Sequence, residues 1–304
     1  MHPILAVGSV AFDSIKTPFG EANRVVGGAA TYFAIAASFF TEVRVVAVVG
    51  EDFGANVDKV FGGRKIDLTG LEKVPGETFR WKGEYGFDLN SRETIYTHLN
   101  VFEAFKPKIP ARHRTSPFVF LGNIHPTLQT DVLNQVERPL LVGADTMNYW
   151  IERTPDELKQ VLKRVDVLLI NDSEARELAR EANLVKAART VQAMGPKTLV
   201  IKRGEHGVLM TRAAGGFFAA PAMPLEEVFD PTGAGDTFAG GFLGYLASCD
   251  TIDDGSMARA IIYGSTMASF AVEDFSCDRL LRLTSDEVKE RYREFKKLTH
   301  FDVV

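Results

Sequence analysis

The residues that most strongly predict chemistry lie in the stretch 230–238, which reads Asp-Pro-Thr-Gly-Ala-Gly-Asp-Thr-Phe. Gly233 and Gly235 leave no side chains in front of the main-chain N–H groups, and apolar residues at helical spacing follow. A glycine turn that opens onto a helix N-terminus presents unpaired N–H groups and about half a positive charge, which together bind an anion. The pattern therefore predicts an anion site at Gly233, Ala234 and Gly235.

Asp236 lies at the edge of this predicted site, where a carboxylate has two interpretations. It can cap the first turn of the helix, with the glycines serving only a tight turn. It can also act as a general base that takes the proton of an acceptor hydroxyl, while the N–H groups stabilise charge on a phosphoryl group. An isolated Gly-x-Gly-Asp favours capping, whereas the nine-residue string favours the base.

The composition excludes several other classes of function. The chain has 304 residues, of which 45% are hydrophobic and 25% charged, as in ordinary globular proteins. Its net charge of −5 provides no basic field for nucleic acid or an anionic membrane. Its two cysteines lack metal-like spacing, and we find no signal peptide or bilayer-spanning run, so we expect a cytoplasmic protein. It also lacks the Walker loop and the dinucleotide-binding glycine motif, which leaves the 233–236 turn to handle phosphate.

The elements that position these residues alternate between apolar strands and helical stretches, a pattern that predicts an α/β fold with a mainly parallel sheet. The expected buried strands span 4–8, 43–49, 118–121, 140–143, 167–170 and 198–201. Polar groups gather at the carboxyl ends of such strands, and we expect the cleft there. Alternating residues in the segments near 10–26 and 76–100 predict a small β-sheet lid that excludes water from the cleft.

The extended string 230–242 resembles the C-terminal signature of the ribokinase-like (pfkB-type) family of sugar and nucleoside kinases. Gly27 and Gly28, followed by a small-residue helix, a strand and the segment 50–54, resemble the family's N-terminal signature. The resemblance covers most of the chain and is densest over 4–54 and 167–247. It implies one ribokinase-like domain over 1–304, in which helices flank a mainly parallel sheet on both faces and the lid covers the acceptor.

The resemblance implies an ATP-dependent kinase that transfers the γ-phosphoryl group to a hydroxyl, preferably a hydroxymethyl, of a sugar, nucleoside or cyclic polyol. Asp236 is then the base, and the 233–235 turn is the anion hole. Asn171 and Glu174 match the family's Asn-x-x-Glu near the phosphates and Mg²⁺, which Glu174 would hold directly or through water. The competing interpretation of this pair is a helix cap, which Ser173 could also provide.

Further positions match the family's nucleotide and cation sites. Lys202, Arg203, Gly204 and Gly207 correspond to the strand-end nucleotide loop, where a threonine is more usual than Lys202. A lysine there adds positive charge against ATP phosphate or is merely solvated. Ser265 stands where relatives often place an asparagine beside the adenine. By the same analogy, Thr232 and Asp230 help to bind a monovalent cation such as K⁺.

The acceptor's identity stays open at this stage. Asp13, Gly27 and Gly28 match the family's acceptor-holding positions, but Tyr32 replaces the asparagine that usually bonds a sugar hydroxyl. We therefore prefer a nucleoside or polyol over a simple furanose. Arg92 is a candidate contact for an anionic acceptor, although exposed strand charges are usually only solvated. Aromatic residues available for stacking a base are Tyr32, Phe33, Tyr85 and Phe87.

Two functions of other classes compete with the kinase. A ligand-binding or regulatory protein can keep the same fold without turnover, because fold does not settle function. A dehydrogenase on a similar parallel sheet is disfavoured by the missing dinucleotide motif. The exposed edge of the lid sheet is also a place where two copies of the chain could pair into a homodimer.

Overall fold

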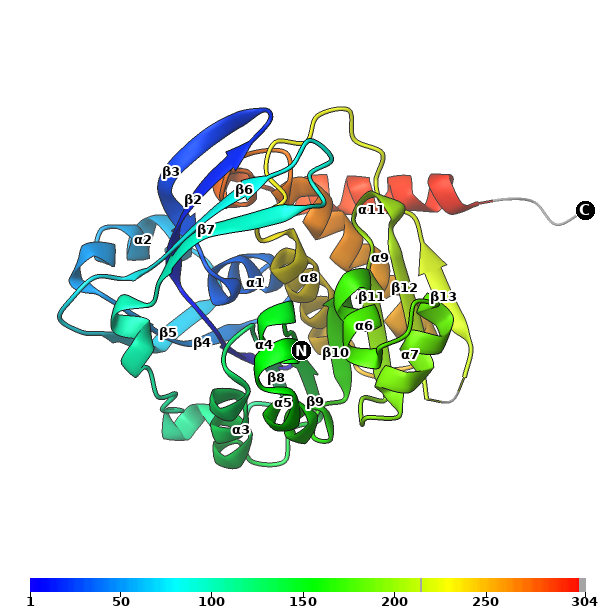
Figure 1. Cartoon of the computed structure of the whole chain (residues 1–304), viewed down its shortest axis with the longest axis horizontal. Coiled ribbons are helices and arrows are strands. Elements are labelled where there is room, and N and C mark those ends of the chain that lie inside the picture. Colours follow the sequence, from blue (N-terminus) through cyan, green and yellow to red (C-terminus); the bar gives the residue numbers. More distant parts are fainter. Residues whose placement is uncertain (214, 301–304) are drawn as a thin grey trace, which may run out of the picture.

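The computed structural model describes residues 1–213 and 215–300 and builds its main sheet from nine strands. The order is β13-β12-β11-β10-β9-β8-β1-β4-β5, which runs from right to left in Figure 1. The pairs from β5 through β11 are parallel, and β12 and β13 are added antiparallel. The strands of this sheet are β1 (Ile4–Val7), β4 (Val43–Val49), β5 (Ile66–Lys73), β8 (Phe118–Leu121), β9 (Leu141–Ala144), β10 (Val167–Asn171), β11 (Thr198–Lys202), β12 (Val208–Arg212) and β13 (Phe217–Ala220).

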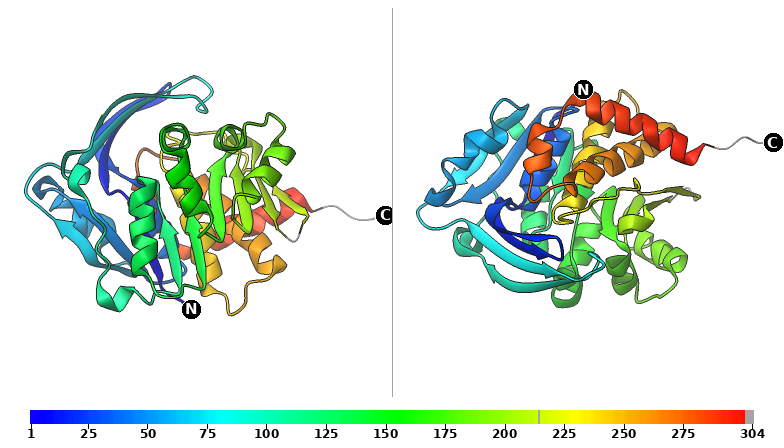
Figure 2. Two further views of the ribbon diagram at one scale, coloured as in Figure 1. Left: turned by 60° about the horizontal axis from the view of Figure 1, so that its bottom comes forward. Right: turned by 90° about the horizontal axis from the view of Figure 1, so that it is seen from above.

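Apolar residues on both sides of each central strand require helices on both faces of the sheet. In β1, Ile4 and Ala6 belong to one buried cluster, whereas Leu5 and Val7 belong to another, as alternation along a strand dictates. Figure 2 shows the two helical layers on opposite sides of the sheet. The first cluster takes in residues of α1 (Ala29–Ala37), α2 (Asn56–Phe61), α8 (Ala234–Ser248), α9 (Asp254–Ala271), α10 (Asp278–Arg282) and α11 (Ser285–Thr299). The second takes in residues of α3 (Pro126–Gln135), α4 (Asn148–Arg153), α5 (Pro155–Leu162), α6 (Asp172–Ala179) and α7 (Leu184–Gln192).

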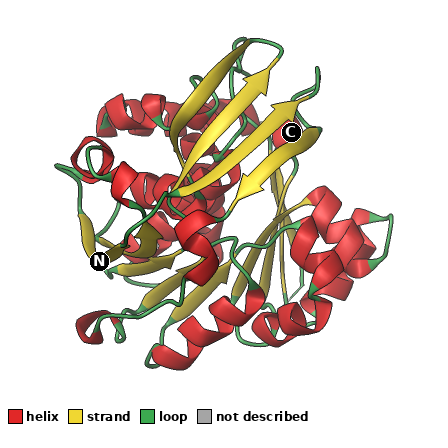
Figure 3. Cartoon of the chain, turned by 60° about the vertical axis from the view of Figure 1, so that its left-hand side comes forward, coloured by secondary structure: helices red, strands yellow, loops and turns green. Residues whose placement is uncertain are grey.

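A second, four-stranded sheet stands apart from the main one, as Figure 3 shows. Its order is β3-β2-β6-β7, with strands β2 (Ala11–Thr17), β3 (Gly20–Gly27), β6 (Phe79–Tyr85) and β7 (Arg92–His98). These strands come from the two segments expected to form a lid. Short 3₁₀ turns, η1 (Glu51–Phe53), η2 (Asn100–Ala104), η3 (Ala111–His113) and η4 (Gly204–His206), complete the described elements. Among the described residues, we find no helix with both the length and the apolar character needed to cross a bilayer.

The sequence patterns place the buried strands to within about one residue at most ends but do not predict β5, β12 or β13. β5 and β13 are the two edges of the main sheet. β5 carries partly exposed polar residues, which weaken the apolar signal, and β13 is a four-residue strand whose first three residues are at least partly exposed. β12 also alternates between buried and half-buried positions. The main sheet is therefore wider than the apolar runs alone indicate. The assignment of 1–304 to a single domain stays a prediction.

Helices α1 and α8 pack with their backbones in contact, because α8 carries glycine at the interface. A Cβ on Gly240 would lie 2.5 Å from the carbonyl oxygen of Phe33 and 2.8 Å from Cβ of Ala36. Both distances are shorter than real Cβ contacts allow. The small residues of α8 therefore serve packing, and they fix the direction in which its N-terminus points.

We expect Gly240→Val to lower the free energy of unfolding by about 1–3 kcal/mol, the usual cost of overpacking a core. Urea denaturation followed by circular dichroism measures this. Gly54→Ala is the control, because a Cβ at Gly54 meets only the end of Lys73 at 3.3 Å and a carbonyl at 3.6 Å. Equal midpoints for Gly240→Val and the unaltered protein would contradict the close helix packing.

Candidate active site

The predicted anion turn lies at the start of α8. Gly233 is the N-cap residue, with φ 76°, and in the described part of the chain no side chain caps the helix. The Ala234 N–H donates to the Pro231 carbonyl at 3.2 Å. Within the described chain, the N–H groups of Gly235 and Asp236 have no acceptor. Because first-turn N–H groups favour negative charge, this arrangement can hold phosphate oxygens.

Two side chains surround the turn and explain why it needs glycine. A Cβ on Gly233 would lie 2.4 Å from three ring atoms of Tyr32, which is buried in α1. A Cβ on Gly235 would lie 2.9 Å from Nζ of Lys202. The turn is thus packed against a phenol ring and lies beside an ammonium group.

Asp236 sits in the first turn of α8 but does not cap it. Its carboxylate accepts no hydrogen bond from the described residues, so the capping interpretation has no contact to support it. Burial in its surroundings, reinforced by repulsion from Asp145, raises the pKa of Asp236 to about 7, and Lys202 and Arg92 act against this rise. An unbonded carboxylate with a pKa near neutrality has the properties of a general base.

Lys202 ends β11 and points into the same cluster. Its Nζ lies 3.2 Å from Oδ2 of Asp145, which directly follows β9. Burial works against its charge, but Asp145, Glu174 and Asp236 outweigh burial and raise the pKa of Lys202. The lysine is therefore protonated and not freely solvated. Asp145 was missed as a site residue, although its place at a strand tip is the signal that could have identified it.

Asn171 and Glu174 form a reciprocal capping box at the start of α6. The Glu174 N–H donates to Asn171 Oδ1, and the Asn171 N–H donates to Glu174 Oε2, both at 2.8 Å. The cap is made by this pair and not by Ser173, which corrects that alternative. Burial first, and then the charge of Asp145, raise the pKa of Glu174 to about 7. The pair thus has a structural role, and Glu174 is also a buried carboxylate close to Lys202 and Asp145.

The predicted nucleotide loop links β11 to β12 through η4. The Arg203 N–H donates to the Gly207 carbonyl at 2.8 Å, which closes a tight turn. Gly204 and Gly207 have φ values of 55° and 81°, and a Cβ on Gly204 would lie 2.8 Å from Oδ1 of Asn90. Asn90 lies between β6 and β7, so the small sheet reaches this loop. Ser265 lies half-buried within α9, and no hydrogen bond in the described chain joins it to the turn.

The predicted acceptor residues meet where β2, β3 and α1 come together. A Cβ on Gly27 would lie 1.8 Å from Oδ2 of Asp13, so only glycine fits beside this carboxylate. Burial, followed by Asp230 and Asp236, raises the pKa of Asp13 to about 7. The Tyr32 hydroxyl is buried and has no hydrogen-bond partner among the residues that the structure describes.

The small sheet contributes side chains to the same region. Thr232 Oγ1 donates to the Tyr85 hydroxyl at 3.0 Å. Arg92 is exposed and stacks over the Trp81 ring at 5.2 Å, yet its charge lowers the pKa values of Asp13, Glu174 and Asp236.

The aromatic residues expected to stack a base have different surroundings. Phe33 lies in the core and stacks on Phe120 at 3.9 Å, so it is unavailable for stacking a base. Tyr32 is buried as well. Tyr85 is buried against Thr232, whereas Phe87 is 89% exposed between β6 and β7.

Asp230 is fully buried beneath the turn and uses both carboxylate oxygens. Oδ1 accepts from the Thr232 N–H at 2.8 Å, and Oδ2 accepts from the Ser276 N–H at 3.0 Å. Burial raises its pKa. These bonds connect the turn to the segment that follows α9.

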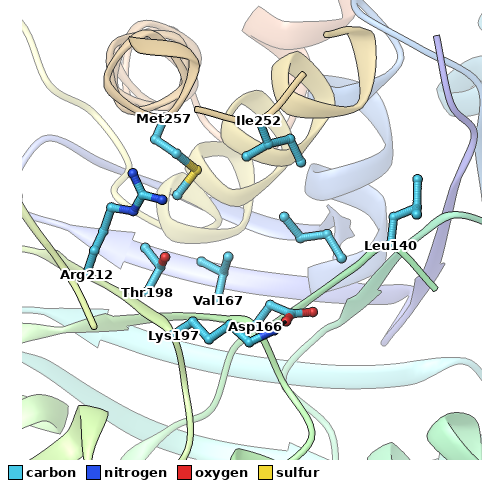
Figure 4. A pocket seen from close by; sticks show the side chains of 9 residues that line it. Leu140, Asp166, Val167, Lys197, Thr198, Arg212, Ile252 and Met257 are labelled. Carbon is cyan, nitrogen blue, oxygen red and sulfur yellow. Dashed lines mark hydrogen bonds and ion pairs between the residues drawn. The ribbon is translucent and has the colours of Figure 1, made fainter. Parts of the chain in front are cut away.

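A cavity of about 220 Å³ lies at the opposite end of the main sheet (Figure 4). It is lined at the first residues of β9, β10 and β11 and by Met257 and Ile252. Strands of this length separate it from the strand tips by about 15 Å. The cavity is therefore distinct from the cluster around Asp236.

Comparisons with known proteins show which proteins this chain resembles. Residues 1–282 match the family described as pfkB family carbohydrate kinase. The chain is 30% identical over 250 residues to the cytidine kinase of Thermococcus kodakarensis, covering 80% of this chain and 88% of that one. Its fold is similar to the nucleoside kinase of Methanocaldococcus jannaschii, with a TM-score of 0.77 and 19% identity over 97% of this chain and 99% of that one. It is also similar to a candidate ribokinase II from E. coli in complex with ATP and Mg²⁺, with a TM-score of 0.78 and 18% identity over 97% and 100%.

Proposed function

The chain belongs to the pfkB family of carbohydrate kinases, and on this premise we propose that it phosphorylates a hydroxymethyl group of a nucleoside with Mg²⁺-ATP. The family makes it a phosphotransferase with an alcohol acceptor on a sugar or nucleoside. The observation that carries the proposed mechanism is the unbonded carboxylate of Asp236 beside the free N–H groups of the anion turn.

The arrangement supports a simple division of roles. Asp236 takes the proton of the acceptor hydroxyl while the acceptor oxygen attacks the γ-phosphorus of ATP. The bond between the γ-phosphorus and the oxygen that links it to the β-phosphate breaks, which releases ADP. The turn from Gly233 to Gly235 holds the charge on the transferred group. Asp13, whose carboxylate lies against Gly27, orients the acceptor hydroxyls. The small sheet excludes water, which would otherwise compete as acceptor.

The donor set fits a bound Mg²⁺-nucleotide. Burial first, and then the charges of neighbouring carboxylates, raise the pKa values of Asp13, Glu174 and Asp236 to about 7 each. A divalent cation relieves this excess of negative charge. Glu174 would hold it directly or through water, since Mg²⁺ takes few protein ligands. When bound, Mg²⁺ neutralises charge on the phosphate oxygens. Arg203, Gly204, Gly207 and Ser265 would bind the nucleotide.

Asp230 and Thr232 are proposed to help bind a monovalent cation. Each carboxylate oxygen of Asp230 already accepts one backbone N–H, so an ion would share these oxygens with the loop. Assays in potassium and in tetramethylammonium salts test this proposal.

Pairing of two copies through the small sheet and a cytoplasmic location are further proposals. Sedimentation velocity of the full chain tests the pairing.

Two observations favour a nucleoside over other acceptors. The Tyr32 ring packs against Gly233 of the turn, at the position where the family resemblance implies an asparagine that bonds a sugar hydroxyl. The relative with 30% identity over 80% of this chain is a cytidine kinase. Tyr32 is therefore proposed to support the turn and not to contact the acceptor. Of the four aromatic residues expected to stack a base, Phe87 is the exposed one and is proposed to contact it.

The test measures ADP release with cytidine, adenosine, inosine, ribose, fructose, fructose phosphates and inositol. We expect the highest kcat/KM with a nucleoside. A preference for a phosphosugar or a free sugar would contradict the acceptor and leave the kinase assignment intact. No acceptor-dependent ADP release, with nucleoside binding seen by thermal shift, would favour the non-catalytic alternative.

A further inference from the structure

Lys202 is a largely buried cation that makes fewer hydrogen bonds than its ammonium group can donate. Its side chain is 17% exposed, and its Nζ lies 3.2 Å from Asp145 Oδ2. Within the described chain this is its one hydrogen bond, although an ammonium group has three donors. Two N–H donors of a largely buried charge therefore have no protein acceptor.

The free donors lie beside the anion turn. A Cβ placed on Gly235 would be 2.9 Å from Lys202 Nζ, so the ammonium is in contact range of the second glycine of the turn. The N–H groups of Gly235 and Asp236 also lack acceptors in the described residues. Main-chain and side-chain donors that lack acceptors among the described residues thus lie next to one another.

We propose that Lys202 is a catalytic residue whose ammonium contacts the transferring phosphoryl group at the anion turn, with Asp145 as the positioning residue that holds it there. This rests on the proposed function. A stability role explains less of the structure, because a buried ion pair contributes little net stability compared with apolar packing. A purely stabilising role also does not explain why two of the three ammonium donors of Lys202 have no acceptor among the described residues.

The ammonium would act in two ways. It stabilises the charge spread over the equatorial oxygens of the phosphoryl group during transfer. It also favours the ionised form of Asp236, which is the form that accepts a proton. The charged groups that face Asp236 are Asp145 from the end of β9, Lys202 from β11, Arg92 from β7 and Asp13 from β2.

The central experiment compares Lys202→Met with the double variant Lys202→Met/Asp145→Asn. We expect Lys202→Met to lower kcat by about 10²–10³-fold, as removal of one preorganised donor does. The single variant leaves Asp145 buried without its partner, which can destabilise the fold, whereas the double variant removes the whole pair. A catalytic lysine leaves kcat low in both variants. If both kcat and the thermal unfolding midpoint recover in the double variant, the proposal is overturned.

Two further readouts distinguish catalysis from packing. We expect the acid limb of the kcat/KM profile to move to higher pH in Lys202→Met and to lower pH in Asp145→Asn. The reason is that the lysine lowers the pKa of Asp236 and Asp145 raises it. By calorimetry, Lys202→Met should weaken binding of a non-hydrolysable ATP analogue about tenfold more than binding of ADP. Unmoved pH limbs and equal losses for the two nucleotides would overturn the proposal.

Asp236→Asn separates this proposal from the function on which it rests. If Asp236→Asn is inactive while Lys202→Met keeps kcat within about threefold of the unaltered enzyme, the kinase mechanism stands and the role of Lys202 falls. If Asp236→Asn keeps its turnover, the proposed mechanism itself falls.

Discussion

Asp236→Asn is expected to lose at least a hundredfold in kcat, because a positioned general base contributes about 10²–10⁴-fold. The amide has the shape of the carboxylate but cannot accept the hydroxyl proton. Nucleotide affinity should stay the same or improve, since the change removes a negative charge beside the phosphates. ADP release gives kcat, and calorimetry with an ATP analogue gives the dissociation constant.

Asp156→Asn is the matched control for this variant. Asp156 also lies in the first turn of a helix, α5, but its side chain is 88% exposed. Any loss caused only by a weaker helix start would appear in both variants. Equal turnover of Asp236→Asn and Asp156→Asn would remove Asp236 from the reaction.

The same carboxylate sets the expected pH dependence. Burial first, and then Asp145, raise the pKa of Asp236 to about 7. Because the base must be ionised to accept a proton, kcat/KM should rise with pH up to about 7 in the free enzyme and then level. Asp236→Asn should lack this limb. A persisting limb with the same midpoint would assign it to another group, for which Asp13 is the first candidate.

Local patterns predicted much of the site because its parts are local in the chain. The glycine turn, the Asn171–Glu174 pair and the strand tips each depend on residues within about five positions of one another. The same locality explains why the pattern 171–174 was ambiguous. A capping box and a nucleotide-side carboxylate use the same two residue types at the same spacing, and the structure shows that Asn171 and Glu174 form the cap.

Contacts between distant segments were beyond reach of the sequence. Lys202 and Asp145 are 57 residues apart and meet because the tips of β9 and β11 flank β10 in a parallel sheet. Tyr32 similarly reaches Gly233 only through the packing of α1 against α8. Spacing along the chain carries no signal for either contact. The sequence could therefore name Lys202 but could not choose between solvation and a contact with ATP phosphate, and it could name Tyr32 but could not show that its ring packs against Gly233.

Gly233→Ala is expected to lower kcat by about 10²–10³-fold, the effect of losing a preorganised main-chain donor. An alanine at φ 76° carries the left-handed penalty of about 1–2 kcal/mol. Its Cβ would also lie 2.4 Å from the buried Tyr32 ring, which cannot move aside without disturbing the core. The turn must shift instead, and its N–H groups then no longer point to the phosphate oxygens.

Gly63→Ala separates the backbone strain of an alanine at positive φ from the displacement of the turn by the Tyr32 ring. Gly63 has φ 71°, nearly the value at Gly233, but a Cβ there meets nothing within 4 Å. It should lose a comparable amount of conformational energy and keep its turnover. Chemical denaturation measures the first effect, and ADP release measures the second. If both variants lose stability and keep activity, the backbone of the turn tolerates displacement and the anion-hole role of Gly233 is wrong. If only Gly233→Ala loses turnover, the position of the turn above Tyr32 is what the reaction requires.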